Sequence, residues 1–248
     1  MAIVSQERRR GRGDVARLLD VVFSAYVALL LLTVIPPVWI GLLVLPRGAL
    51  AARLVRAGVR LVIRASGCSV RVRDVHRLAT GRPIVIVANH GSYLDSVVLM
   101  ATLPVDFVFV ANHKLAAIPF FGLAVRKAGH LVVDRTRAAA RRACVLEMIE
   151  TLRRGRSLVV FPEGTRHRGN ELLPFRLGAF RAAVEVGCPI VPVTINGTTD
   201  IWPPGTWLMH RGAVDIAVQH AVEPVAKSRN EVVRLRDAAR VAITGDME

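Results

Sequence analysis

Cysteine, aromatic residues and acidic residues are all scarce in this chain of 248 residues. The three cysteines stand far apart at positions 68, 144 and 188. They form neither a disulfide framework nor a metal-ligand pattern, so we expect reduced thiols in the core and no metal site. Aromatic residues make up 5% of the chain and no nucleic-acid recognition motif occurs, so we expect no nucleic-acid partner. Internal repeats and low-complexity tracts are also absent.

Positive charge and apolar residues are abundant instead. Lys and Arg number 34 against 19 Asp and Glu, which gives a net charge of +15. Such a balance indicates a polyanionic partner, either nucleic acid, an anionic membrane or a phosphorylated substrate. Hydrophobic residues make up 52% of the chain and the mean hydropathy is +0.42, so part of the surface is expected to meet lipid. The length fits one large α/β domain, or a domain with an appendage.

The N-terminal quarter contains an uncharged stretch, residues 21–46, flanked by arginines on both sides. Pro36 and Pro37 divide it, and each half is too short to cross a hydrocarbon core of about 30 Å as a helix. The length and the two prolines argue against a signal peptide. Because both flanks are basic, both ends are expected on the cytoplasmic side. We predict a membrane-associated helical hairpin that dips into one leaflet; a bent single span and a buried core hairpin are the alternatives.

A second helix is expected over residues 47–66. Its four arginines at 53, 56, 60 and 64 fall on one face, opposite an apolar face. A basic amphipathic helix beside a membrane segment is typical of contact with anionic headgroups, although a solvated charged face has the same pattern. We therefore assign residues 1–66 to a membrane-associated segment on the cytoplasmic face of the cell membrane and residues 67–248 to an α/β domain.

Strand-like and helix-like patterns alternate after residue 67. They predict an α/β fold with a mixed, largely parallel sheet flanked by helices. Val70 and Val72 alternate with arginines, as in an edge strand, and Pro192 within an apolar strand suggests an edge or a bulge. The expected strands are 69–73, 83–88, 106–111, 130–134, 157–161, 189–195 and 213–219. The expected helices are 93–102, 119–128, 137–154, 176–186 and 228–242, the last opening with a capping box at Ser228 to Glu231.

His90 directly follows the most apolar of these strands, and Asp95 stands five residues later. Ligands of open α/β sheets bind at the carboxyl ends of the strands. A histidine oriented by a carboxylate is suited to remove a proton from a hydroxyl group. The spacing alone is weak evidence, because His210 and Asp215 repeat it. That second pair runs into a strand where an odd offset puts the side chains on opposite faces, so we interpret His210 as a loop residue.

Two further strands also end in polar residues. Arg135 follows the strand at 130–134, and the strand at 157–161 continues into Glu163, Gly164, Thr165 and Arg166. Gly164 allows close approach of a ligand to the backbone, and an arginine fork suits a phosphate group. Taken alone, Arg135 could form an ordinary surface ion pair, and residues 163–166 could form an ordinary turn. Their common position at strand ends predicts one shared site.

The ordered blocks 89–95, 129–135, 161–166 and 190–193 resemble the glycerolipid acyltransferase family, and most of all its 1-acylglycerol-3-phosphate branch. The resemblance covers about residues 83–200. It implies that His90 is the base and Asp95 its partner. It also implies that Arg135, Glu163, Gly164, Thr165 and Arg166 bind the acceptor or its phosphate. The sequence departs from the family pattern at three places: His113-Lys114 stands where a Lys-Glu pair is common, Arg176 where lysine is usual, and His167 where a small polar residue is usual. The resemblance therefore does not fix the headgroup of the acceptor.

The resemblance implies acyl transfer from an acyl thioester, either acyl-CoA or acyl carrier protein, to the sn-2 hydroxyl of a lysophospholipid acceptor, giving phosphatidic acid. No bound cofactor or metal is implied. No Gly-x-Ser-x-Gly nucleophile motif occurs, so no covalent acyl-enzyme is expected. Backbone amides near Gly91 or Gly164 are candidates to stabilise the oxyanion. The alternatives are another lysolipid or glycerol 3-phosphate as acceptor, and, remotely, a non-catalytic basic module that binds membrane or nucleic acid.

Overall fold

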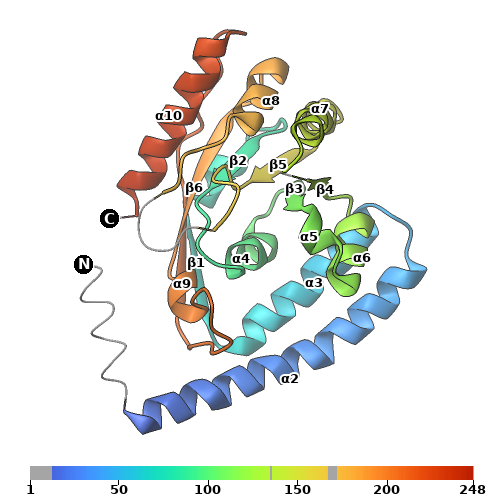
Figure 1. Cartoon of the computed structure of the whole chain (residues 1–248), viewed down its shortest axis with the longest axis vertical. Helices are drawn as coiled ribbons and strands as arrows, with labels where there is room; N and C mark the ends of the chain where they lie inside the picture. Colours follow the sequence, from blue (N-terminus) through green and yellow to red (C-terminus); the bar gives the residue numbers. More distant parts are fainter. Residues whose placement is uncertain (1–12, 135, 167–171, 248) are drawn as a thin grey trace.

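One seven-stranded sheet forms the centre of the computed structural model, which describes residues 13–134, 136–166 and 172–247 (Figure 1). Its order is β1-β7-β6-β2-β5-β3-β4. The five strands from β6 to β4 are mutually parallel, β7 is antiparallel to β6, and β1 pairs in parallel with β7. The predicted mixed, largely parallel sheet is therefore confirmed. The strands are β1 (Ser69–Arg73), β2 (Val85–Ala88), β3 (Phe107–Asn112), β4 (Leu131–Val133), β5 (Ser157–Val160), β6 (Ile190–Asn196) and β7 (Ala213–Val218).

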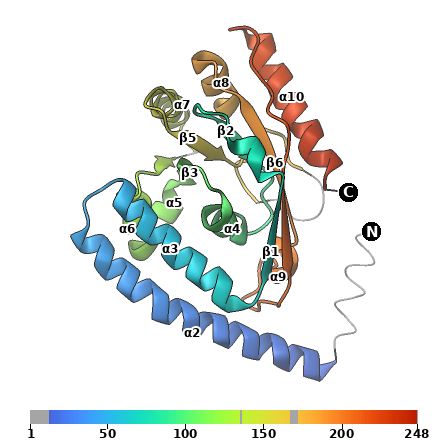
Figure 2. The ribbon, with the colours of Figure 1, turned by 180° about the vertical axis from the view of Figure 1, so that it is seen from behind.

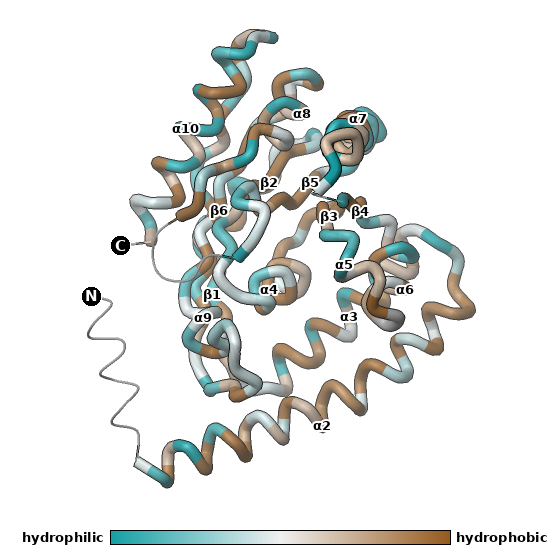
Figure 3. Tube along the Cα trace, in the orientation of Figure 1, coloured by the Kyte–Doolittle hydropathy of each residue, from teal (hydrophilic) through white to brown (hydrophobic). Residues whose placement is uncertain are grey.

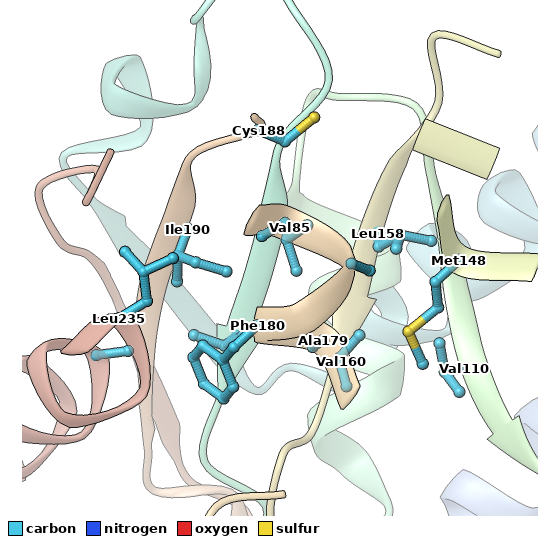
Figure 4. Close-up of a cluster of buried hydrophobic side chains, with 14 of the residues drawn as sticks. Val85, Val110, Met148, Leu158, Val160, Ala179, Phe180, Cys188, Ile190 and Leu235 are labelled. Carbon is cyan, nitrogen blue, oxygen red and sulfur yellow. The ribbon is translucent and has the colours of Figure 1, made fainter. Parts of the chain in front are cut away.

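Both faces of the sheet are covered, which explains why its central strands are continuously apolar. Val85 and Val87 of β2 point into a cluster formed with helices α7 (Ala138–Arg153), α8 (Gly178–Val186) and α10 (Arg229–Gly245) (Figure 4). Ile86 and Ala88 point the opposite way, toward α4 (Leu94–Thr102). Each fully buried Val or Ile contributes roughly 1.5–3 kcal/mol to stability. This double burial makes the carboxyl end of β2 a rigid platform.

The five helices predicted after residue 67 are also present, the remaining one being α6 (Pro119–Lys127). Ser228 caps α10, because its hydroxyl accepts the Glu231 N–H at 3.1 Å. The reciprocal half of the predicted capping box is not formed, since the Glu231 carboxylate accepts the Val225 N–H instead. Three short elements were not predicted, because four residues are too few to show a helical period: η1 (Val75–Leu78), α5 (His113–Ala116) and α9 (Thr198–Ile201).

The predicted break at Pro36-Pro37 is wrong. A single helix, α2 (Asp14–Val44), runs through both prolines, and at about 1.5 Å per residue it is roughly 46 Å long. Proline has the φ of an α-helix, so the helix can continue, although each ring removes a backbone donor and crowds the carbonyl four residues earlier. Val34 and Val38, on either side of the proline pair, pack closely against Gly58 of the next helix, and contact with a neighbouring helix can offset such a cost. By length and composition α2 can cross a membrane. Figure 3 shows it as a mostly hydrophobic rod along the edge of the molecule.

A helical hairpin does exist, but its turn lies at Leu45–Gly48. The turn is held by α6, because the Lys127 ammonium donates to the Leu45 carbonyl at 2.6 Å and Gly48 N–H donates to the Lys127 carbonyl at 2.9 Å. The returning helix α3 (Ala49–Ser66) lies between α2 and α4 (Figure 2). Gly58 permits this close packing, since a Cβ there would come within 2.8 Å of the Val38 side chain.

The arginine face of α3 divides into two halves. Arg56 and Arg60 turn inward and donate to main-chain carbonyls. Arg60 donates to Ala101 in the last turn of α4 at 2.7 Å, and Arg56 donates to Val105 in the loop after α4 at 3.2 Å. Arg53 and Arg64 are exposed. With Ala57 and Leu61, the four arginines line a hollow of about 370 Å³. Only part of the predicted basic face is therefore free for an external anion.

The two special strand predictions are resolved by the sheet order. The edge position of β1 is confirmed. Pro192 lies in β6, an interior strand of the sheet, so the prediction that it marks an edge strand is wrong. The alternative prediction, that it marks a bulge, is confirmed. The chain advances four residues from Val218 to Val222 while its partner β6 moves only three, from Val193 to Ile190. A register shift of this kind is a bulge beside the proline that lacks an N–H group.

Candidate active site

Asn89 fixes the point where the chain leaves β2. Its side-chain amide donates to the Ile195 carbonyl and its oxygen accepts the Ile195 N–H, both at 2.8 Å. The side chain is buried, and it replaces the strand pairing that ends there. The next residue, His90, is therefore delivered from a fixed position on the sheet into the turn that opens α4.

Asp95 lies in the first turn of α4 and is 1% exposed. Its Oδ2 accepts three N–H groups, from His90 Nδ1 at 2.9 Å and from the Gly91 and Ser92 amides at 2.8 Å each. Its Oδ1 accepts the Thr198 hydroxyl at 2.6 Å. Because Nδ1–H donates to this carboxylate, Nε2 is the ring nitrogen left to accept a proton. The predicted pair thus has the geometry that a general base requires.

Glu163 anchors the main chain of the same histidine. It lies just after β5, is 3% exposed, and its Oε1 accepts the His90 N–H at 2.8 Å. Its Oε2 accepts the Leu173 N–H at 2.9 Å. Both oxygens therefore bind backbone donors from distant segments. This geometry adds a positioning role that the sequence did not suggest.

Gly164 needs its glycine identity for two reasons. Its φ of +75° is in the left-handed region, which favours glycine. A Cβ at this position would come within 2.5 Å of Arg176 Nε. The Arg176 side chain therefore lies across the glycine, beside the turn that holds Glu163. Arg176 is exposed, so the structure brings a further guanidinium group to this turn.

Arg166 approaches the histidine turn from beyond the carboxyl end of the neighbouring parallel strand β5. Its guanidinium carbon lies 3.5 Å from the centre of the Tyr93 ring, which is a cation–π contact. Tyr93 in turn lies 5.6 Å from Trp202, whose carbonyl accepts the Ser92 hydroxyl at 3.1 Å. Thr165 is exposed nearby in sequence, and Arg135 lies outside the described residues.

The second His-Asp pair is separated, as expected. His210 Nδ1 lies 2.8 Å from Asp20 Oδ1 on α2, whereas Asp215 forms an ion pair with Arg73. Both amides predicted as oxyanion donors are already bound within the protein. The Gly91 amide donates to Asp95, and the Gly164 amide donates to the Phe161 carbonyl at 3.1 Å. The structure therefore does not support these two amides as oxyanion donors.

Thr198 is the residue of this site that sequence reasoning missed most clearly. It lies just beyond the end of β6, after Asn196 and Gly197, so the same strand-end rule that found His90 also points to it. Asn89, Tyr93 and Trp202 were missed because their contacts cross between segments far apart in the sequence. Among the described residues, no three His, Cys, Asp or Glu side chains gather closely enough to hold a metal ion.

Comparison with known proteins decides the family. The family model described as Acyltransferase matches residues 69–196, which include β1 to β6 and every described site residue except Thr198 and Trp202. The chain belongs to the acyltransferase family. In this chain, His90 lies in the turn between β2 and α4, Asp95 lies in the first turn of α4, and Glu163 reaches the His90 main chain from just after β5.

Curated relatives of this acyltransferase share one kind of name. A 1-acyl-sn-glycerol-3-phosphate acyltransferase from Borreliella burgdorferi is 27% identical over 79% of this chain and 78% of its own length. The human 1-acyl-sn-glycerol-3-phosphate acyltransferase beta is 32% identical over 71% of this chain, which spans 64% of the human protein. The crystal structure of the 1-acyl-sn-glycerophosphate acyltransferase PlsC from Thermotoga maritima shares the fold, with a TM-score of 0.75, 23% identity and coverage of 94% of this chain and 96% of that one.

Proposed function

We propose that this acyltransferase moves a fatty acyl group from an acyl thioester to the sn-2 hydroxyl of 1-acylglycerol 3-phosphate, giving phosphatidic acid. The observation that carries the proposal is the Asp95 carboxylate, which binds His90 Nδ1 and leaves Nε2 as the ring nitrogen that can accept a proton. The names of the curated relatives point to the same acceptor. The donor is a thioester of coenzyme A or of acyl carrier protein, and the reacting carbonyl is the same in both.

The chemistry follows from the position of the free ring nitrogen. His90 Nε2 takes the proton of the acceptor hydroxyl as that oxygen attacks the thioester carbonyl carbon. A C–O bond forms, the C–S bond breaks, and the imidazolium returns its proton to the leaving sulfur. Asp95 stabilises the imidazolium between these two transfers. Each proton is accounted for by one histidine, so no covalent acyl-enzyme is required.

The acceptor's phosphate is bound by arginines at the strand ends. Arg166 lies over Tyr93, next to the histidine turn, and a guanidinium fork suits a phosphate group. We assign the same role to Arg135. Gly164 and Thr165 form the turn against which the phosphate rests. Glu163 acts through His90, because its carboxylate holds the histidine's main-chain N–H.

The membrane surface is the proposed location of this reaction, on the cytoplasmic side. The lipid-facing element is α2, which exposes large apolar side chains along most of its length, among them Leu18, Leu29 and Leu32 at 61–71%. Beside it, the exposed Arg53 and Arg64 can contact anionic headgroups. Burial, and then the charge of Arg60, lower the pKa of Arg56, while Asp106 opposes this shift. The four arginines that line the hollow give it a positive charge, which favours a negative partner.

The test is acyl transfer from an acyl thioester to lysophosphatidic acid in detergent micelles. We expect His90→Ala to lower kcat by about 10²- to 10⁴-fold, the usual contribution of a general base. The matched control is His220→Ala, because His220 is exposed and remote from the turn. A panel with other lysolipids and glycerol 3-phosphate tests the acceptor. Equal rates for wild type and His90→Ala would show that the chemistry happens elsewhere.

A further inference from the structure

A stack of aromatic rings lies behind His90, in a chain that has few aromatic residues. The His90 ring is nearly parallel to the Phe161 ring, with the centroids 4.1 Å apart and 16° between the planes. Phe161 is in turn nearly parallel to Phe109, at 6.3 Å and 14°. His90 lies just after β2, Phe161 lies just after β5 and Phe109 lies within β3. The three strands are neighbours in the sheet. The stack therefore joins the reacting side chain to the core.

Phe161 is held firmly in this stack. It is 7% exposed and belongs to the buried cluster on the α4 side of the sheet. Phe109 is fixed edge-on by Phe107 at 5.1 Å and by His130 at 5.5 Å. A ring supported in this way cannot tilt without disturbing the core. The plane of the His90 imidazole is consequently set by two groups, Asp95 at its edge and Phe161 at its face.

We propose that Phe161 is a positioning residue that holds the imidazole plane and stabilises the imidazolium form of His90 during acyl transfer. The proposal rests on the proposed function, in which His90 carries a proton between two transfers. The face of a benzene ring carries partial negative charge and attracts a cation much more than a neutral ring. Phe161 therefore stabilises the protonated histidine more than the resting one, and such differential interaction accelerates the reaction.

The charges around this stack are compatible with that role. Among the described residues, the charged groups that contact His90 are Asp95 from α4, at the ring, and Glu163 after β5, at the main-chain N–H. At the far end of the stack, burial and then the charge of Arg156 lower the pKa of His130 to about 4. His130 is therefore neutral at pH 7 and does not compete as a cation for the aromatic rings.

The experiment first removes the Phe161 ring and then, in a second set of variants, keeps the ring but changes its charge distribution. Phe161→Leu keeps an apolar side chain without a π face. Incorporation of mono-, di- and trifluorophenylalanine at position 161 keeps the shape while it progressively weakens the negative face. Acyl transfer to lysophosphatidic acid is measured from pH 5 to 9, with the midpoint of the acidic limb as readout. Phe180→Leu is the matched control, because Phe180 is buried on the opposite face of the sheet.

For Phe161→Leu we expect kcat to fall by about 2- to 30-fold with little change in the acceptor KM. The acidic limb should move to lower pH by about 0.4 to 1.5 units, because the protonated histidine loses stabilisation. The fluorinated variants should have kcat values and acidic limbs between those of wild type and Phe161→Leu. Both quantities should approach the Phe161→Leu values as the number of fluorine atoms rises. Phe180→Leu should leave the limb in place.

Two outcomes would overturn the proposal. One is a fluorinated series in which kcat and the acidic limb stay at the wild-type values, even if Phe161→Leu itself misfolds. The other is an unchanged titration midpoint of the His90 ring in NMR spectra of the substrate-free variants. The NMR measurement does not depend on turnover. An inactive wild type with a shifted midpoint would therefore contradict the proposed function and leave the stacking interaction intact.

Discussion

Asp95→Asn separates the charge of the carboxylate from its hydrogen bonds. Three N–H groups converge on Oδ2, and only an oxygen can accept them, so the asparagine oxygen should take that place. The asparagine NH₂ then faces Thr198, whose hydroxyl can rotate and accept. The turn from His90 to Ser92 should therefore keep its conformation. The negative charge beside the imidazolium is lost.

The expected rate loss follows from that charge. Two unit charges about 4 Å apart attract by about 4 kcal/mol at an effective dielectric constant near 20. This energy corresponds to roughly a 10³-fold decrease in kcat. Because His90 and Asp95 act as one unit, the His90→Ala, Asp95→Asn double variant should be no slower than His90→Ala alone. The acceptor KM should change little.

The assay is initial-rate acyl transfer from an acyl thioester to lysophosphatidic acid, with purified variants whose folding is checked by circular dichroism. Asp200→Asn is the matched control, because Asp200 is an exposed aspartate in the neighbouring helix α9 and should retain the wild-type rate. A folded Asp95→Asn enzyme within fivefold of wild type would refute the reasoning. So would a double variant in which the two losses multiply.

Three further predictions concern stability. Thr198→Val leaves Asp95 Oδ1 without its donor and should destabilise the fold by about 1–3 kcal/mol in urea titrations, whereas Thr199→Val should be near neutral. His130 has a pKa of about 4, below its unfolded value, so the free energy of unfolding should fall by up to about 3 kcal/mol as pH drops from 6.5 to 4. His130→Asn should lack that slope, and equal slopes would contradict the burial argument. Gly58→Val should push α3 away from α2 and lower the melting temperature; an unchanged temperature would show that the hairpin relaxes freely.

The strands and long helices could be predicted because burial imposes a period on the sequence. β2 is apolar on both faces since helices cover both, and β1 alternates because it lies at the edge. His90 and the Glu163 turn were found by one rule, that parallel strands end at the same edge of the sheet. Those inferences need only local sequence and sheet geometry.

The rest depends on contacts between distant segments. Nothing around Asn89 indicates that it will bind Ile195, and Glu163 was interpreted as a substrate ligand because its backbone partners His90 and Leu173 are remote in sequence. The two prolines in α2 were predicted to end a helix, because proline has a low helix propensity. The structure shows one continuous helix, because the rest of this long apolar segment favours the helical conformation. Arg60 was assigned to the membrane face, although it binds the end of α4.

The loop from Trp202 to His210 connects the long apolar helix to the catalytic turn. At one end, His210 pairs with Asp20 and Met209 N–H donates to the Ser24 hydroxyl at 2.8 Å, both partners being on α2. At the other end, the Trp202 carbonyl holds Ser92. Besides its contact with lipid, α2 therefore supports the loop that holds one side of the active site. A chimera that replaced α2 by an unrelated anchor would keep its lipid affinity and still lose the side of the active site that this loop supports.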